Sequence, residues 1–140
     1  MLSALNAAAS ATLESWHAMI RSHDTSGLPA LLDANAVFRS PVAHKPYHGA
    51  TAVALILQTA EKVFSNFAYH REFVSEDGLS VVLEFSADVG DGEGKRALKG
   101  IDMVRFNVDG KIVEFEVMVR PATGVQALGE AMGKQLLGRV

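Results

Sequence analysis

The chain has 140 residues, of which 49% are hydrophobic, and a formal net charge of −3 at pH 7. This length and composition predict one globular domain, residues 1–140, with enough apolar side chains for a core. The absence of cysteine excludes disulfides, thiolate metal ligands and cysteine nucleophiles. The charge and the lack of a basic cluster argue against nucleic acid, and no apolar run is long enough to span a membrane. We expect a cytoplasmic protein without a signal peptide.

The first half of the chain predicts helices around one short strand. Apolar residues at helical spacing over residues 5–20 predict an amphipathic helix of about five turns. A short helix over 28–33 follows, and residues 36–40 (AVFRS) predict a strand that ends before a proline. After a loop over residues 41–48, residues 50–65 predict a second long helix.

The second half changes to a period of two, which predicts strands. Residues 67–74 and 79–87 form two such runs, and an acidic glycine-rich loop over 90–94 separates them from a hairpin over 98–120. Helical spacing returns over 125–136. Helices followed by a meander of strands predict an α+β layer, in which the helices cover one face of a curved, mainly antiparallel sheet.

The hairpin has one face that is apolar except for a single carboxylate, Asp102. Asp109-Gly110 is the predicted two-residue turn, because both residues tolerate positive φ. Side chains alternate along a strand, so Glu114 and Glu116 would lie on the opposite face. The predicted pairs are Phe106 with Val113, Val104 with Phe115 and Asp102 with Val117, and Val119 shares their face.

A bulged turn is the alternative for this hairpin. It would reverse the faces of one strand and bring Glu116 beside Asp102, which would make a carboxylate pair. The apolar alternation over residues 113–119 favours the register without that reversal. The side on which Glu114 and Glu116 lie stays open at this point.

Two stretches resemble ketosteroid isomerases. Residues 35–53, NAVFRSPVAHKPYHGATAV, are similar to a pattern in which a strand ends in Asp-Pro-Val and Pro-x-x-Gly precedes a helix. Residues 101–111 resemble the final hairpin of the same enzymes. By this resemblance the chain is identified as a member of the nuclear transport factor 2-like superfamily, which includes SnoaL-like polyketide cyclases. The resemblance implies a cone-shaped, cystatin-like α+β fold that encloses a pocket, commonly in a dimer.

The resemblance also places three functional positions. Asp102 falls on the family's protonated aspartic acid, which donates a hydrogen bond to the substrate oxygen. Ser40 replaces the general-base aspartate, and Trp16 replaces a tyrosine that donates a second hydrogen bond. A serine without a basic partner does not abstract protons as a carboxylate does, so we do not expect authentic ketosteroid isomerase activity. What replaces the base, and whether the protein is catalytic, stay open.

We expect the pocket to hold a small hydrophobic molecule with a carbonyl group, and Asp102 to act as a neutral proton donor or acid/base. The predicted ligand contacts are Trp16, Phe38, Ser40, Tyr47, Leu57, Val104, Phe115, Val117 and Val119. We expect no cofactor. We also expect no metal, because Pro46 prevents a helix that would bring the side chains of His44 and His48 together. The alternatives are a non-catalytic binding protein and a dimeric interaction module. The sequence does not name the ligand.

The face of the hairpin opposite Asp102 predicts a homodimer. Strict alternation places Met103, Ile112 and Met118 on it, among charged residues. Such a face is more apolar than a solvated sheet surface requires.

Overall fold

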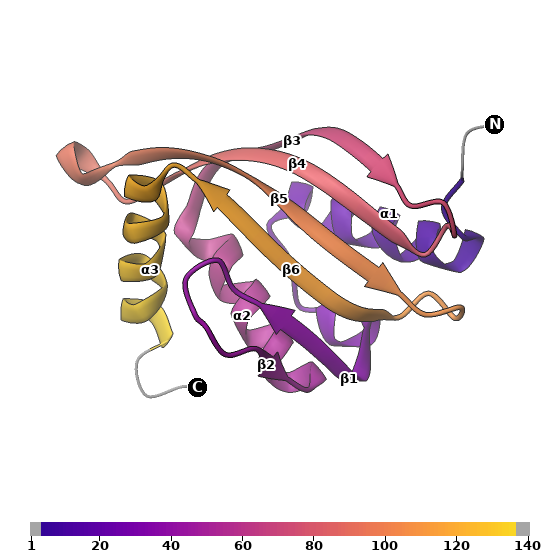
Figure 1. The fold of residues 1–140 in the computed structure, drawn as a ribbon. Helices are drawn as coiled ribbons and strands as arrows, with labels where there is room; N and C mark the ends of the chain where they lie inside the picture. The colour runs from indigo at the N-terminus through magenta and orange to yellow at the C-terminus, as the bar shows by residue number, and fades with distance from the viewer. Residues whose placement is uncertain (1–3, 137–140) are drawn as a thin grey trace.

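The computed structural model describes residues 4–136, in which three helices pack against one curved six-stranded sheet (Figure 1). The helices are α1 (Ala7–Ser22), α2 (Ala50–Val63) and α3 (Ala122–Leu136), with short 3-10 helices η1 (Leu28–Leu31) and η2 (Gly92–Gly94). The strands are β1 (Leu32–Arg39), β2 (Tyr47–His48), β3 (Phe64–Val74), β4 (Ser80–Val89), β5 (Arg96–Phe106) and β6 (Ile112–Arg120).

The strand order in the sheet is β2-β1-β6-β5-β4-β3. β1 and β6 run parallel, and every other neighbouring pair is antiparallel. This arrangement confirms the predicted α+β fold with a mainly antiparallel sheet. No helix in the described part of the chain combines the length and the hydropathy that crossing a membrane requires.

Helix α1 begins at a side-chain cap and presents one apolar stripe to the sheet. The Asn6 side chain accepts a hydrogen bond from the Ala9 amide (3.1 Å), which satisfies a free amide of the first turn. Ala9, Leu13 and Trp16 are buried at helical spacing, as the sequence predicts. The helix ends where His23 adopts a left-handed conformation.

The predicted strand over 36–40 is longer and ends earlier than expected. β1 starts at Leu32, because the chain pairs there with β6, and it stops at Arg39. Ser40 therefore lies just beyond the strand, at the start of the loop that leads to β2. The short helix predicted over 28–33 is a 3-10 turn over Leu28–Leu31.

The hairpin has the predicted register at Asp102 and a different one near its turn. Asp102 pairs with Val117 and Val104 with Phe115, but a bulge follows Arg105, so Phe106 pairs with Ile112 instead of Val113. The assignment of Ile112 to the outer face was therefore wrong: it is 2% exposed, in the core. Because the extra residue lies next to the turn, the rest of β6 keeps its faces.

The predicted side of the two β6 glutamates is confirmed. Glu116 pairs across the hairpin with Met103, and Glu114 pairs with Arg105. Their side chains are therefore on the face opposite Asp102. The Glu114 carboxylate accepts a hydrogen bond from Arg39 Nε at 3.1 Å. The carboxylate pair that a reversed strand would have made with Asp102 is not formed.

Strand β3 departs twice from strict alternation. Its register with β4 shifts between Ser65 and Ala68, and again between Tyr69 and Glu72. Alternation alone would keep Tyr69 and Arg71 on one face. The second irregularity separates them, so the Tyr69 ring points inward while Arg71 binds Glu84 on the outer face.

Candidate functional site

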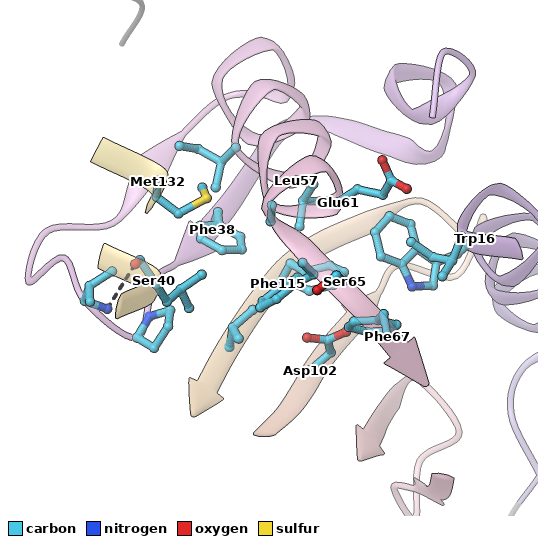
Figure 2. Close-up of a pocket in the computed structure, with 18 of the residues that line it drawn as sticks. Trp16, Phe38, Ser40, Leu57, Glu61, Ser65, Phe67, Asp102, Phe115 and Met132 are labelled. Atoms are coloured by element: carbon cyan, nitrogen blue, oxygen red, sulfur yellow. Dashed lines mark hydrogen bonds between the residues drawn. The ribbon is translucent and has the colours of Figure 1, made fainter. Parts of the chain in front are cut away.

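A cavity of about 1150 Å³ lies between the sheet and the helices. Its volume is slightly above the roughly 300–1,000 Å³ of pockets that bind small molecules. All three helices, the five strands β1, β2, β3, β5 and β6, and the loop over residues 40–43 contribute to its wall. The wall is chiefly aromatic and aliphatic, with the rings of Trp16, Phe38, Phe67 and Phe115 around its interior (Figure 2).

Asp102 is the buried acidic group in this largely apolar wall. It lies on β5 and is 5% exposed. Its Oδ2 accepts a hydrogen bond from the Tyr69 hydroxyl at 2.6 Å, and the Tyr69 oxygen accepts one from Trp16 Nε1 at 2.9 Å. Side chains from β5, β3 and α1 thus form one hydrogen-bonded chain that ends at a carboxyl group.

Burial controls the ionisation of the Asp102 carboxyl group and the Tyr69 hydroxyl group. It raises the pKa of Asp102 from 3.8 to about 7, and the Tyr69 hydrogen bond acts in the opposite direction. Burial, followed by the negative charge of Asp102, raises the pKa of Tyr69 well above 10. Near neutral pH Tyr69 therefore stays protonated, while Asp102 exists in both forms.

Aromatic contacts fix the positions of these side chains. The Trp16 ring packs edge-on against Phe115, with centroids 5.5 Å apart. The Tyr69 ring packs edge-on against Phe67 at 4.8 Å and against His17 at 5.2 Å. Each partner of Asp102 is thus held from two sides, by a hydrogen bond and by packing.

Seven of the nine predicted contacts line the cavity together with Asp102: Trp16, Phe38, Ser40, Tyr47, Leu57, Phe115 and Val117. The structure does not place Val104 and Val119 in the cavity wall. Val104 is buried within the main core cluster, and Val119 packs against a second cluster that contains Phe85 and Leu128.

Ser40 uses its acceptor capacity within its own loop. Its hydroxyl oxygen accepts hydrogen bonds from the amides of Val42 (3.1 Å) and Ala43 (3.2 Å). Figure 2 shows Ser40 on the side of the cavity away from Trp16. The hydroxyl proton can still donate to a bound molecule, but the oxygen is a poor base.

Tyr69 bonds to Asp102 and lines the cavity, but it is not among the contacts predicted from the sequence. Alternation along residues 67–74 does not say which face points to the helices, and the two irregularities of β3 leave no mark in that pattern. Phe67, Glu61 and Met132 also line the cavity, from β3, α2 and α3, without having been predicted from the sequence. An aromatic pair two residues apart, Phe67 and Tyr69, was the available signal.

Charged residues gather where the end of α1 meets α2. His23 Nδ1 lies 2.8 Å from Glu61 Oε1, and Arg21 also lines the cavity. Figure 2 shows the Glu61 carboxylate pointing away from Asp102, so the two acids do not form a pair. Among residues 4–136 no group of three His, Asp or Glu side chains converges in a way that would hold a metal ion.

The model of the SnoaL-like domain family matches residues 13–115, which include Trp16, Ser40, Tyr69 and Asp102. The chain therefore belongs to the SnoaL-like domain family, in agreement with the resemblance to the nuclear transport factor 2-like superfamily. A search of curated proteins found no match.

Solved structures extend this comparison. A steroid delta-isomerase from Pseudomonas aeruginosa is 61% identical, with a TM-score of 0.91 over 97% of this chain and 96% of that chain. A bacterial protein with a cystatin-like fold from Silicibacter pomeroyi is 31% identical, with a TM-score of 0.82 over 91% and 86% of the two chains. A putative isomerase from Bacillus subtilis is 26% identical, with a TM-score of 0.66 over 87% and 93%.

Proposed function

We propose that the protein binds a hydrophobic small molecule with a carbonyl group in the cavity, and that Asp102 exchanges a proton with that molecule. The observation that carries the proposal is a carboxyl group that is buried in an apolar wall and has a pKa of about 7. A proton-transfer group works best when its pKa is close to the pH at which it operates.

The site favours proton transfer next to a carbonyl. A neutral Asp102 donates a hydrogen bond to the carbonyl oxygen and stabilises the negative charge that develops there when a water molecule takes a proton from the neighbouring carbon. The apolar side chains around Asp102 lower the local dielectric constant, which strengthens this interaction. The similar structure from Pseudomonas aeruginosa, a steroid delta-isomerase, supports a ring ketone as the class of ligand.

Binding without turnover is the second candidate function. The observation in its favour is that Ser40 occupies the position that the resemblance gives to the general base, with its oxygen engaged by two loop amides. Among the described lining residues, Glu61 is the other carboxylate, and it is bonded to His23. A pocket with one proton donor and no opposed base would hold a ketone without converting it.

One experiment separates these functions. Trp16 is the sole tryptophan and lines the cavity, so quenching of its fluorescence reports binding of ring ketones. Proton NMR in D₂O then follows exchange of the hydrogens next to the carbonyl. Exchange that is lost in Asp102→Asn and kept in Asp91→Asn, an exposed loop control, supports the enzyme. Quenching without exchange supports the binding protein, and the absence of quenching by every ketone contradicts both.

A further inference from the structure

We propose that Tyr69 is a positioning residue, which occupies Oδ2 of Asp102 and thereby directs the acidic proton to Oδ1, the oxygen left for a ligand. This inference rests on the proposed function, because it specifies which atom of Asp102 meets the carbonyl group. It concerns a residue on β3, a strand whose inward face is set by two irregularities of register.

The direction of the hydrogen-bonded chain follows from its first member. An indole N–H is a donor and has no acceptor, so the Tyr69 oxygen accepts from Trp16 at 2.9 Å. Tyr69 has a single proton, and the structure gives its hydroxyl no partner among the described residues besides Trp16 and Asp102. That proton therefore points at Oδ2 of Asp102, 2.6 Å away.

This direction determines where a neutral Asp102 carries its own proton. If the proton sat on Oδ2, it would compete with the Tyr69 proton for the same short contact. With the proton on Oδ1, Oδ2 remains a pure acceptor and both hydrogen bonds of Tyr69 are kept. Oδ1 then donates when Asp102 is neutral and accepts when it is ionised, so one atom serves both halves of a proton transfer.

Tyr69 also influences the balance between the two forms. Its hydrogen bond favours the ionised carboxylate and so lowers the pKa of Asp102 against the larger effect of burial. The Trp16 hydrogen bond lowers the pKa of Tyr69, which makes the tyrosine a stronger donor. Removing either donor should therefore move the ionisation of Asp102 to higher pH, and removing Tyr69 should have the larger effect.

Other titratable groups surround the same cavity and have to be separated from Asp102. They are His17, Arg21 and His23 from the end of α1, Tyr47 from β2 and Glu61 from α2. His17 touches the Tyr69 ring, and its Nε2 lies 3.7 Å from Glu72 on β3. The variant Asp102→Asn keeps all of them and removes only the ionisation of Asp102.

The test compares a ketone with the hydrocarbon of the same shape. Calorimetry between pH 5 and pH 9 measures the affinities of 1-tetralone and tetralin, whose ratio isolates the hydrogen bond to the carbonyl oxygen. In the wild type this ratio should fall by roughly tenfold as Asp102 ionises, because the free energy of one such hydrogen bond corresponds to about that factor in affinity. The pH at which the affinity ratio has fallen halfway should be higher in Trp16→Phe than in the wild type, and higher still in Tyr69→Phe. In Asp102→Asn the ratio should stay constant with pH.

A second readout needs no ligand. The carboxyl ¹³C shift of Asp102, assigned by its absence in Asp102→Asn, gives the titration midpoint directly in each variant. A titration midpoint in Tyr69→Phe equal to that of the wild type overturns the role of Tyr69, regardless of how the affinity for tetralone depends on pH. If Tyr69→Phe does not fold, an unchanged midpoint in Trp16→Phe overturns it. A constant tetralone-to-tetralin ratio in the wild type contradicts the proposed function instead.

Discussion

Asp102 makes the stability of the fold depend on pH. Burial raises its pKa from 3.8 to about 7, so between these values the unfolded chain ionises while the folded chain keeps its proton. The contribution of Asp102 to stability is complete below pH 3.8 and is lost as the pH rises toward 7. The interval between the two pKa values corresponds to about 4 kcal/mol.

The variant Asp102→Asn should therefore gain relative stability at high pH. Its amide oxygen can accept the Tyr69 hydrogen bond, and it has no charge to bury. We expect the variant to equal or exceed the wild type in free energy of unfolding at pH 8, with a smaller advantage at pH 4. Denaturant unfolding at both pH values measures this, with Asp91→Asn as control. A variant that is weaker at pH 8 but not at pH 4 would show that Asp102 is an ionised structural acid.

Ser40 gives a prediction about the proposed reaction with a ring ketone. We expect the wild type to isomerise a Δ5-3-ketosteroid slowly, because the hydroxyl oxygen of Ser40 serves two loop amides. Ser40→Asp should raise turnover by about 10²-fold or more, since a carboxylate at this position can act as the base and can still accept from the loop. The absorbance of the conjugated product measures the rate. Fast wild-type turnover that survives Ser40→Ala would mean that the base lies elsewhere.

At the level of elements, the spacing of apolar residues in the sequence predicted the regular parts of the helices and strands. The apolar stripes of α1 and α2 and the pairing of Asp102 with Val117 follow from spacing alone. The irregularities of β3 and the bulge beside the hairpin turn do not, because one inserted residue shifts the register without changing composition. Asp102 was therefore predictable as an isolated acid on an apolar face, whereas the inward position of Tyr69 required the structure.

The turn of the hairpin depends on Gly110. This residue has a φ of +84°, and a Cβ atom there would lie 2.5 Å from the carbonyl oxygen of Ala8. Gly110→Ala should lower the free energy of unfolding by about 1–3 kcal/mol, because it combines an unfavourable backbone conformation with a steric clash. Thermal or denaturant unfolding checks this against Gly92→Ala, which has a positive φ but no atom within 4 Å. Equal losses in the two variants would show that contact with α1 contributes nothing.

At the level of the whole molecule, the outer face of the sheet remains a predicted dimer interface. The burial of Ile112 removes one residue from that prediction. Met118 remains exposed (45%) beside Met103, and Phe73 (52% exposed) adds to this apolar surface. On the same face Glu84 is buried between Arg71 and Lys99, at 2.7 Å and 3.2 Å. These ion pairs lower the pKa of Glu84 to about 2. A neutralised, partly apolar face suits contact with a second copy.

We predict a dimer in sedimentation at concentrations of roughly tens of micromolar, and a shift toward monomer in Met118→Glu, since a charge at the centre of such a contact is unfavourable. Val108→Glu, at an exposed position on the hairpin turn, is the matched control and should leave the mass unchanged. A monomeric wild type would contradict the prediction. A dimer that binds no ketone would favour the interaction module.

The attachment of α1 has a consequence for the order of folding. Its N-terminal end is bonded to the turns of two different hairpins, through Asn6 N and Gly78 O at 2.7 Å and through Thr12 Oγ1 and Gly110 O at 2.5 Å. Both turns must exist before these bonds form, and the second joins residues 98 positions apart. We therefore expect α1 to dock late, bringing Trp16 to the cavity after the meander has formed. Thr12→Val should then speed unfolding more than it slows refolding in stopped-flow experiments, and the reverse result would place α1 in the folding nucleus.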